Sequence, residues 1–426
     1  MRTMSAAEHS IFFFLQMAVI LAACRVVGRL ARHFGQPQVV GEMIAGVVLG
    51  PSLFGLLWPA GQQALFPAET LKVLYVGAQL GVGLYMFLVG VEFRTDLFRA
   101  RARSAAAVSV AGMIAPFVLG ALVALWLVRV PGMFAPEART FEAMLFLGAA
   151  MAITAFPMLA RIIYERGLTG TALGTLALSA GAIDDAAAWC VLAIVLASFG
   201  GGAWVAVKAI TGGLLYAVVM TTLGRRLLAP LGDRVGSDGR IGHGTLGLVL
   251  MLLMLAAWLM DYAGIHAVFG GFLLGTAMPR GRFAEALRQQ LEPFAVVFLL
   301  PMFFTFSGLK TRLDLVNSPQ LLLIAAAVLF AAVGGKGVAC RAAARATGAD
   351  QRTAMAVGTL MNARGLMELI ILNIGLQRGL IGLPLFSIMV VMAIVTTLMA
   401  SPLFELVYGR HARAAGRLGP AAGGAG

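Results

Sequence analysis

Long apolar segments separated by short polar connections run along most of this chain. Each segment is close to the about 20 residues that a helix needs to cross a bilayer. The pattern predicts about thirteen membrane-spanning helices, at roughly residues 10–28, 38–55, 71–92, 104–128, 141–164, 171–198, 203–229, 243–262, 264–279, 291–309, 319–342, 352–376 and 381–407. We therefore expect an all-α polytopic membrane protein with inverted repeats, in which residues 1–408 form the membrane domain and residues 409–426 a short disordered tail.

The composition supports this class. Of 426 residues, 60% are hydrophobic and only 12% are charged, whereas a soluble protein carries about twice that charged fraction. The net charge of +13 then reflects arginines at helix ends and does not indicate a nucleic-acid partner. The expected surroundings are membrane lipid.

Basic residues are distributed unevenly between the connections, and this asymmetry predicts the topology. Connections after even-numbered spans are poor in them. Connections after odd-numbered spans hold most of them, including Arg29, Arg32, Arg99, Arg101, Arg103, Arg166, Arg225, Arg226, Arg234, Arg240, Arg280, Arg282, Arg288, Arg341, Arg345 and Arg352. Because positive loops stay in the cytoplasm, the N-terminus is expected outside and the C-terminus inside a plasma (inner) membrane.

The chain also contains an internal repeat. Residues 90–97 and 308–315 both read G-h-x-x-R-x-D-L, where h is apolar. One span earlier, residues 45–50 resemble residues 270–275. Each pair lies an odd number of spans apart, so the two copies enter the membrane in opposite orientations. Inverted repeats of this kind are typical of secondary transporters with a site at mid-membrane.

Two adjacent carboxylates, Asp184 and Asp185, lie near the middle of the span at residues 171–198. An ionised Asp at the bilayer centre costs at least about 2.5–3.5 kcal/mol on insertion scales. A polar clamp between helices would explain them structurally. An ion or proton site is the functional interpretation, and the rest of the chain favours it.

Two other spans contain residues that interrupt helices. Pro157 lacks an amide hydrogen, so backbone carbonyls one turn earlier lose their partners, and Thr154 adds a hydroxyl there. Asn362 and Gly365 make the span at 352–376 a poor continuous helix. A packed proline kink would also explain the first interruption. Two half-helices facing each other at mid-depth would favour a cation site beside the Asp pair.

Three further charges lie inside predicted spans. Lys336 is far from the end of its span, and a pair with an Asp accounts for it better than snorkelling to the interface. Arg364 and Glu368 are four residues apart and can pair on one helix face. For these last two, structural pairing and a role at the site remain equally open.

Several of these motifs resemble the monovalent cation:proton antiporter-2 family. They are T-A-F-P-M-L-A-R-I at 154–162, the Asp184–Asp185 pair, M-N-A-R-G-L-M-E-L-I at 361–370, G-E-M-I-A-G-V-V-L-G-P at 41–51 and S-G-L-K-T at 307–311. The first and third are similar to the plant cation/proton exchangers and their bacterial relatives. We expect no nucleotide-binding regulatory domain in this chain, unlike the glutathione-gated potassium efflux systems of the same family.

The resemblance implies the sodium/proton antiporter fold, with two crossed discontinuous helices at spans five and twelve. It implies dimerisation helices at about 10–92 and 243–309, core transport helices at about 104–198 and 319–407, and a linker helix at about 203–229. It also implies that Asp185 is the essential cation- and proton-binding carboxylate, that Asp184 pairs with Lys336, and that the protein is a homodimer.

These observations predict a secondary antiporter of Na⁺ or K⁺ and protons, not an enzyme, and one that needs no cofactor. Burial and a like charge both favour a protonated carboxyl group, so a proton and an alkali cation would compete at Asp184 and Asp185, with Thr154 nearby. Proton release from Lys336 would make exchange electrogenic. Alternatives are a sodium-coupled organic-solute symporter, a cation channel and an intramembrane aspartyl protease, although neighbouring carboxylates on one helix point apart.

Overall fold

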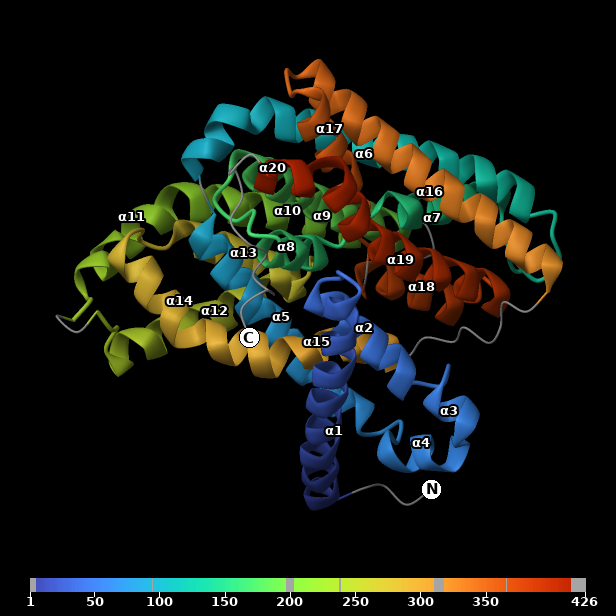
Figure 1. The fold of residues 1–426 in the computed structure, drawn as a ribbon, viewed down its shortest axis with the longest axis horizontal. Coiled ribbons are helices and arrows are strands. Elements are labelled where there is room, and N and C mark those ends of the chain that lie inside the picture. The colour runs from blue at the N-terminus through green and yellow to red at the C-terminus, as the bar shows by residue number, and fades with distance from the viewer. Residues whose placement is uncertain are drawn as a thin grey trace.

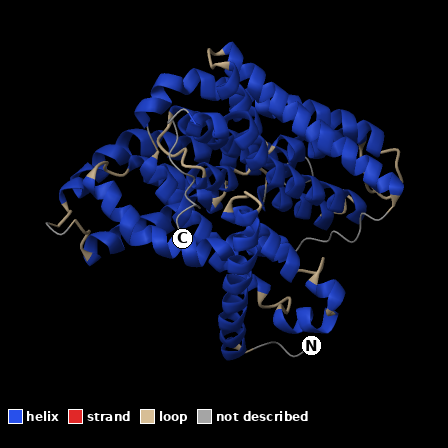
Figure 2. Cartoon of the chain, viewed as in Figure 1, coloured by secondary structure: helices blue, strands red, loops and turns tan. Residues whose placement is uncertain are grey.

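The computed structural model of the chain describes residues 5–93, 95–196, 203–236, 239–309, 318–364 and 366–414 (Figure 1). Figure 2 shows helices joined by loops, and the described residues contain no strand. The first half comprises α1 (Ala6–His33), α2 (Gln38–Leu49), α3 (Phe54–Leu57), α4 (Pro59–Leu65), α5 (Leu71–Glu92), α6 (Thr95–Leu127), α7 (Thr140–Ala152), α8 (Phe156–Glu165), α9 (Ala172–Leu196) and α10 (Ala203–Val219).

The second half continues directly from α10 through a π-helical turn. It comprises η2 (Met220–Gly224), α11 (Arg225–Leu228), η3 (Ala229–Asp233), α12 (His243–Ala263), α13 (Ala267–Ala277), α14 (Arg282–Phe294), η4 (Ala295–Leu299), α15 (Leu300–Leu309), α16 (Pro319–Ala346), α17 (Gln351–Leu360), α18 (Leu366–Gln377), α19 (Leu383–Phe404), η5 (Glu405–Gly409) and α20 (Arg410–Ala414).

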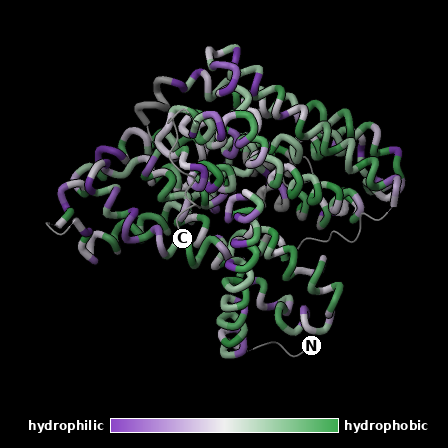
Figure 3. The backbone as a smooth tube through the Cα atoms, viewed as in Figure 1, coloured by the Kyte–Doolittle hydropathy of each residue, from purple (hydrophilic) through white to green (hydrophobic). Residues whose placement is uncertain are grey.

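Each of the predicted spans falls on one helix or on a run of consecutive helical segments. By length and hydropathy, 10 helical segments among the described residues can cross a membrane. The other predicted spans correspond to α9, to α13, which has only 11 residues, and to the pair α17–α18. Figure 3 shows hydrophobic residues along the long helices and hydrophilic ones gathered mainly at the turns.

Local chemistry at several helix ends agrees with the sequence. Ser5 and Glu8 form a reciprocal capping box at the start of α1, which satisfies amides that have no partner within the helix. The Asp350 side chain accepts from two amides at the start of α17. The end of the chain differs from the prediction: helix continues through Ala414, where Arg413 pairs with Glu405, so the disorder expected from residue 409 is wrong for residues 409–414. Residues 415–426 lie outside the described residues.

Helix packing divides into two groups. One consists of α1, α2, α5 and α12–α15, which pack mainly on one another. The other consists of α6–α9 and α16–α19; in Figure 1, α6 and α16 lie side by side along its upper edge. Helix α10 packs on α9 and on α12, and therefore contacts both groups.

The repeated glycines of the sequence are points of close helix approach. A Cβ atom on Gly308 of α15 would lie 2.3 Å from the backbone nitrogen of Val47 in α2, and one on Gly90 of α5 would lie 2.1 Å from the carbonyl oxygen of Phe272 in α13. In the sequence repeat, α2 corresponds to α13, and the end of α5 corresponds to the end of α15. The contact of α2 with α15 in one place is therefore equivalent to the contact of α13 with α5 in the other. The same backbone approach therefore occurs in both repeats, and no side chain fits there.

We expect Gly90→Ala to destabilise the protein, because the new methyl group must displace backbone of α13. Overpacking of this kind typically costs about 1–3 kcal/mol. The measurement is the thermal unfolding temperature of purified protein in detergent. Gly83→Ala is the matched control on the same helix, since a Cβ there meets nothing within 4 Å. Equal unfolding temperatures for the two variants would contradict this account of the packing.

Candidate functional site

Asp184 lies on α9 at the centre of a buried polar network. Its Oδ1 accepts a hydrogen bond from the Ser109 hydroxyl of α6 at 2.9 Å. Its Oδ2 accepts from the Thr154 hydroxyl at 2.5 Å and from Nζ of Lys336 on α16 at 3.0 Å. Both oxygens of Asp184 are thus satisfied, and the ion pair with Lys336 is shielded from solvent, since both side chains have 0% exposure.

Asp185 is the next residue on α9 and has a different environment. The residue is 1% exposed, and neither Oδ1 nor Oδ2 has a hydrogen-bond partner among the described residues. Adjacent side chains on a helix project about 100° apart, which explains why Asp184 reaches the α6–α16 network and Asp185 does not. A buried carboxylate with two free oxygens is an acceptor for a proton or a cation.

The helical span that contains Pro157 is broken beside these carboxylates. Helix α7 ends at Ala152 and α8 begins at Phe156, which places Pro157 in the first turn of α8, where its missing amide hydrogen costs nothing. The intervening Ala155 donates its N–H to the carbonyl of Ala363 at 3.1 Å. This hydrogen bond joins the two unwound segments of the site directly.

The carbonyls at the end of α7 accept from two buried cations. Lys336 Nζ donates to the Ala152 carbonyl at 2.5 Å. Arg364 donates to the carbonyls of Met151 at 2.6 Å and Ala150 at 3.4 Å. These last-turn carbonyls have no partner within the helix, and the two cations also complement the partial negative charge at the helix C-terminus.

The second interruption lies between α17, which ends at Leu360, and α18, which begins at Leu366. The hydroxyl of Thr397 on α19 accepts from the Arg364 amide at 3.1 Å and donates to the Arg364 carbonyl at 2.6 Å. Asn362 donates to the Gly358 carbonyl at 2.9 Å, and its Oδ1 is buried with no partner among the described residues. The unwound backbone is therefore held by side chains from neighbouring helices. Gly365, the other predicted helix breaker, lies outside the described residues.

Arg364 and Glu368 do lie on one face, with 3.6 Å between Nη1 and Oε2. Arg364 is 0% and Glu368 1% exposed. The Glu368 oxygens accept no hydrogen bond from the described residues, so Arg364 makes its shorter contacts to the α7 carbonyls. The structure thus gives Arg364 a task that the sequence spacing did not indicate.

The structure therefore brings Thr154 and Lys336 into direct contact with Asp184. It places the Arg364 side chain, from the other broken helix, against the end of α7. It also adds residues that the sequence reasoning missed. Ser109 and Thr397 are the important ones, each one of a few hydroxyl residues in a mainly apolar span. Their polarity within those spans was the available signal, but the partner of a lone hydroxyl cannot be read from its own helix.

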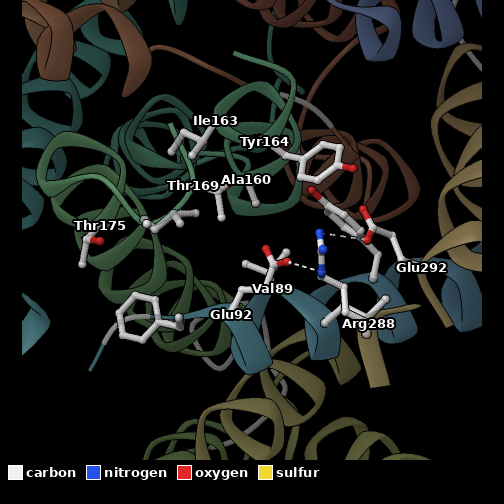
Figure 4. Close-up of a pocket in the computed structure, with 14 residues that line it drawn as sticks. Val89, Glu92, Ala160, Ile163, Tyr164, Thr169, Thr175, Arg288 and Glu292 are labelled. Atoms are coloured by element: carbon white, nitrogen blue, oxygen red, sulfur yellow. Dashed lines mark ion pairs between the residues drawn. The ribbon is translucent and has the colours of Figure 1, made fainter. Parts of the chain in front are cut away.

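A small cavity opens between the two helix groups, toward the N-terminal end of α9. It measures about 30 Å³ and is lined by residues of α5, α8, α9 and α14. Figure 4 shows Arg288 between two carboxylates, Glu92 at 3.4 Å and Glu292 at 3.5 Å, with Tyr164 next to Glu292. Thr175 on its wall lies about three helical turns from Asp185.

Residues 18–407 match the family described as "Sodium/hydrogen exchanger, transmembrane". The chain belongs to this family. It is 41% identical over 398 residues to "Na(+)/H(+) antiporter NhaS4" of Synechocystis sp., an alignment that covers 92% of this chain and 95% of the relative. It is 27% identical to "Na(+)/H(+)-K(+) antiporter GerN" of Bacillus cereus, which covers 94% and 98% of the two chains.

A plant relative and a solved structure are also similar to this chain. "Cation/H(+) antiporter 17" of Arabidopsis thaliana is 36% identical over 94% of this chain, but the alignment spans only 49% of that relative. The sodium proton antiporter MjNhaP1 from Methanocaldococcus jannaschii has a solved structure that superposes with a TM-score of 0.52, 13% identity, and coverage of 91% and 94%. That structure supports the fold: this exchanger-family chain is an all-helical multi-span membrane protein.

We expect Arg364→Lys to destabilise the protein, although it keeps the charge. A lysine ammonium replaces the planar fork that donates to two carbonyls, and one such charge-assisted bond contributes about 1.5–3 kcal/mol. The thermal unfolding temperature in detergent measures this loss. Arg378→Lys, at an exposed turn position just after α18, is the matched control and should leave the temperature unchanged. An unchanged unfolding temperature for Arg364→Lys would contradict the role assigned to the Arg364 guanidinium group.

Proposed function

We propose that this protein exchanges a monovalent cation, Na⁺ or K⁺, for protons, and that Asp185 is the residue at which the two compete. Family membership and the named relatives, antiporters of Na⁺, K⁺ and H⁺, support the activity. The observation that carries the site assignment is the pair of buried Asp185 oxygens without a donor. A dehydrated alkali cation and a proton would each neutralise that carboxylate, and only one of them can do so at a time.

The residues around Asp185 have distinct proposed roles. Asp184 is saturated by three donors, so it would hold α9 against α6 and α16 until a cation draws it away from Lys336. Thr154 and the unwound backbone beside it offer further oxygen ligands of the kind that alkali and other hard cations prefer. Asn362 Oδ1, buried and unpartnered, is a further oxygen in the second unwound segment.

The two packed helix groups suit alternating access. We assign α6–α9 and α16–α19 to a moving core and α1, α2, α5 and α12–α15 to a scaffold, with α10 as the linker. The Glu92–Arg288–Glu292 cavity lies between these groups (Figure 4) and would be the route from the cytoplasm. A movement of the core would expose Asp185 to each side in turn.

We also propose the orientation with the N-terminus outside and the C-terminus in the cytoplasm of the plasma (inner) membrane. The support is the arginine distribution of the sequence. A homodimer formed through the scaffold helices is part of the same proposal. The family resemblance is its support.

We expect Asp185→Asn to abolish exchange, because the amide neither releases a proton nor neutralises a cation. The measurement is the dissipation by Na⁺, K⁺ or Li⁺ of a respiration-driven pH gradient in everted membrane vesicles. Asp233→Asn, at an exposed position of η3, is the matched control and should exchange normally. Exchange near the wild-type rate in Asp185→Asn would overturn the assignment. If no alkali ion dissipates the pH gradient in vesicles that contain inserted wild-type protein, the result would favour the sodium-coupled solute symporter.

We expect exchange by the wild-type protein to respond to membrane potential, and exchange by the double variant Asp184→Asn, Lys336→Gln not to. Lys336 releases its proton when a cation breaks its ion pair, so more than one proton moves per cation. Replacing both partners avoids the about 3–5 kcal/mol cost of an unpaired buried charge. The test compares rates in proteoliposomes with and without an imposed potential. Equal responses in the two proteins would contradict this role of Lys336.

A further inference from the structure

A second polar cavity lies away from the Asp pair, between α1, the start of α2, α8 and the junction of η4 with α15. It has a volume of about 340 Å³. Four arginines line it: Arg25, Arg29 and Arg32 from α1, and Arg161 from α8. The opposite wall is apolar and is formed by residues such as Val297 and Phe298 of η4. One wall of the cavity is therefore cationic and the opposite wall is apolar, a combination that suits an amphipathic anion.

The three arginines of α1 lie on one face of that helix. They are spaced by four and three residues, which a helix of 3.6 residues per turn brings into line. All three are exposed. Within the part of the chain that the structure describes, none of them forms an ion pair with a carboxylate. Their charges are therefore available to an external anion.

Arg161 differs because it is almost fully buried, with 4% exposure. Its Nε lies 2.7 Å from Oε1 of Glu165, but the Glu165 carboxylate also accepts from the backbone amides of Gln38 at 2.5 Å and Val39 at 3.3 Å. Nη1 of Arg161 has no acceptor among the described residues. A buried charged donor without an acceptor is costly, and an anion in the cavity would remove that cost.

The neighbouring acids do not cancel this charge. Glu42, which is 0% exposed, accepts from the side-chain amide of Gln38 at 3.1 Å. Glu165 caps the start of α2 through the backbone amides of Gln38 and Val39. Four arginines line the cavity and neither of these carboxylates does, so the lining carries a net positive charge. Because Arg161 is on α8 and the others are on α1, an anion in the cavity would contact both helix groups.

We propose that this cavity binds the phosphate group of an anionic phospholipid. Guanidinium groups match phosphate oxygens with paired hydrogen bonds, and the apolar wall formed with Leu21 and Pro301 suits the glycerol and acyl part of a lipid. A free phosphate ion shares the charged half of this chemistry but gains nothing from the apolar wall. The site does not depend on the antiport proposal.

The test uses the purified full-length protein in nanodiscs of phosphatidylcholine, with and without phosphatidylglycerol, in a phosphate-free buffer. A ligand that binds only the folded state raises the unfolding temperature. We expect phosphatidylglycerol to raise it for wild type, and Arg29→Gln and Arg161→Gln to lose at least half of that rise. Arg226→Gln removes the same charge at an exposed position outside the cavity and should keep the full rise.

Each other outcome counts against part of the proposal. An equal rise in wild type, Arg29→Gln and Arg226→Gln would mean a general surface-charge effect and would overturn it. A rise produced in phosphatidylcholine nanodiscs by inorganic phosphate, and lost in Arg29→Gln, would assign the site to free phosphate and overturn the lipid assignment. Because Arg29 is exposed, Arg29→Gln should fold. Its lipid-induced rise in unfolding temperature therefore tests the proposal even if Arg161→Gln fails to fold.

Discussion

Backbone groups that leave a helix inside a membrane must find partners in the protein, since lipid offers none. This constraint governs the centre of the molecule. Opening α7–α8 releases the carbonyls of Ala150, Met151 and Ala152, and Lys336 and Arg364 satisfy them. The two buried cations, for which the sequence predicted only carboxylate partners, thus also supply the donors that the broken backbone needs.

The same arrangement separates the two neighbouring carboxylates. Lys336 bonds the Ala152 carbonyl and Asp184 together, so the ion pair of Asp184 and the broken helix share one ammonium group. Asp185, one residue later, is outside this network and retains both oxygens. One carboxylate is thereby structural in this state and the other is chemically available, although both are acids buried on the same helix.

The scaffold group relies on a different principle, direct backbone contact at glycines. Gly90 and Gly308 admit their partner helices so closely that no Cβ fits. Such contacts give rigid packing without polar groups, which suits the scaffold role proposed for these helices. In the α6–α9 and α16–α19 group, by contrast, buried polar bonds hold the two helix breaks.

The sequence alone determined the membrane class, the approximate spans, the repeat and the family, because apolar length, charge at helix ends and contiguous motifs are local properties. It also predicted the breaks at Pro157 and Asn362 and a pair of Lys336 with an Asp, which the family resemblance identified as Asp184. Only the tertiary structure decided that Ser109 completes the Asp184 network, that Thr397 clamps the backbone of Arg364, and that Arg364 caps α7. Hydrogen bonds between helices far apart in the chain leave no periodicity in either helix, so they emerge only when the helices pack.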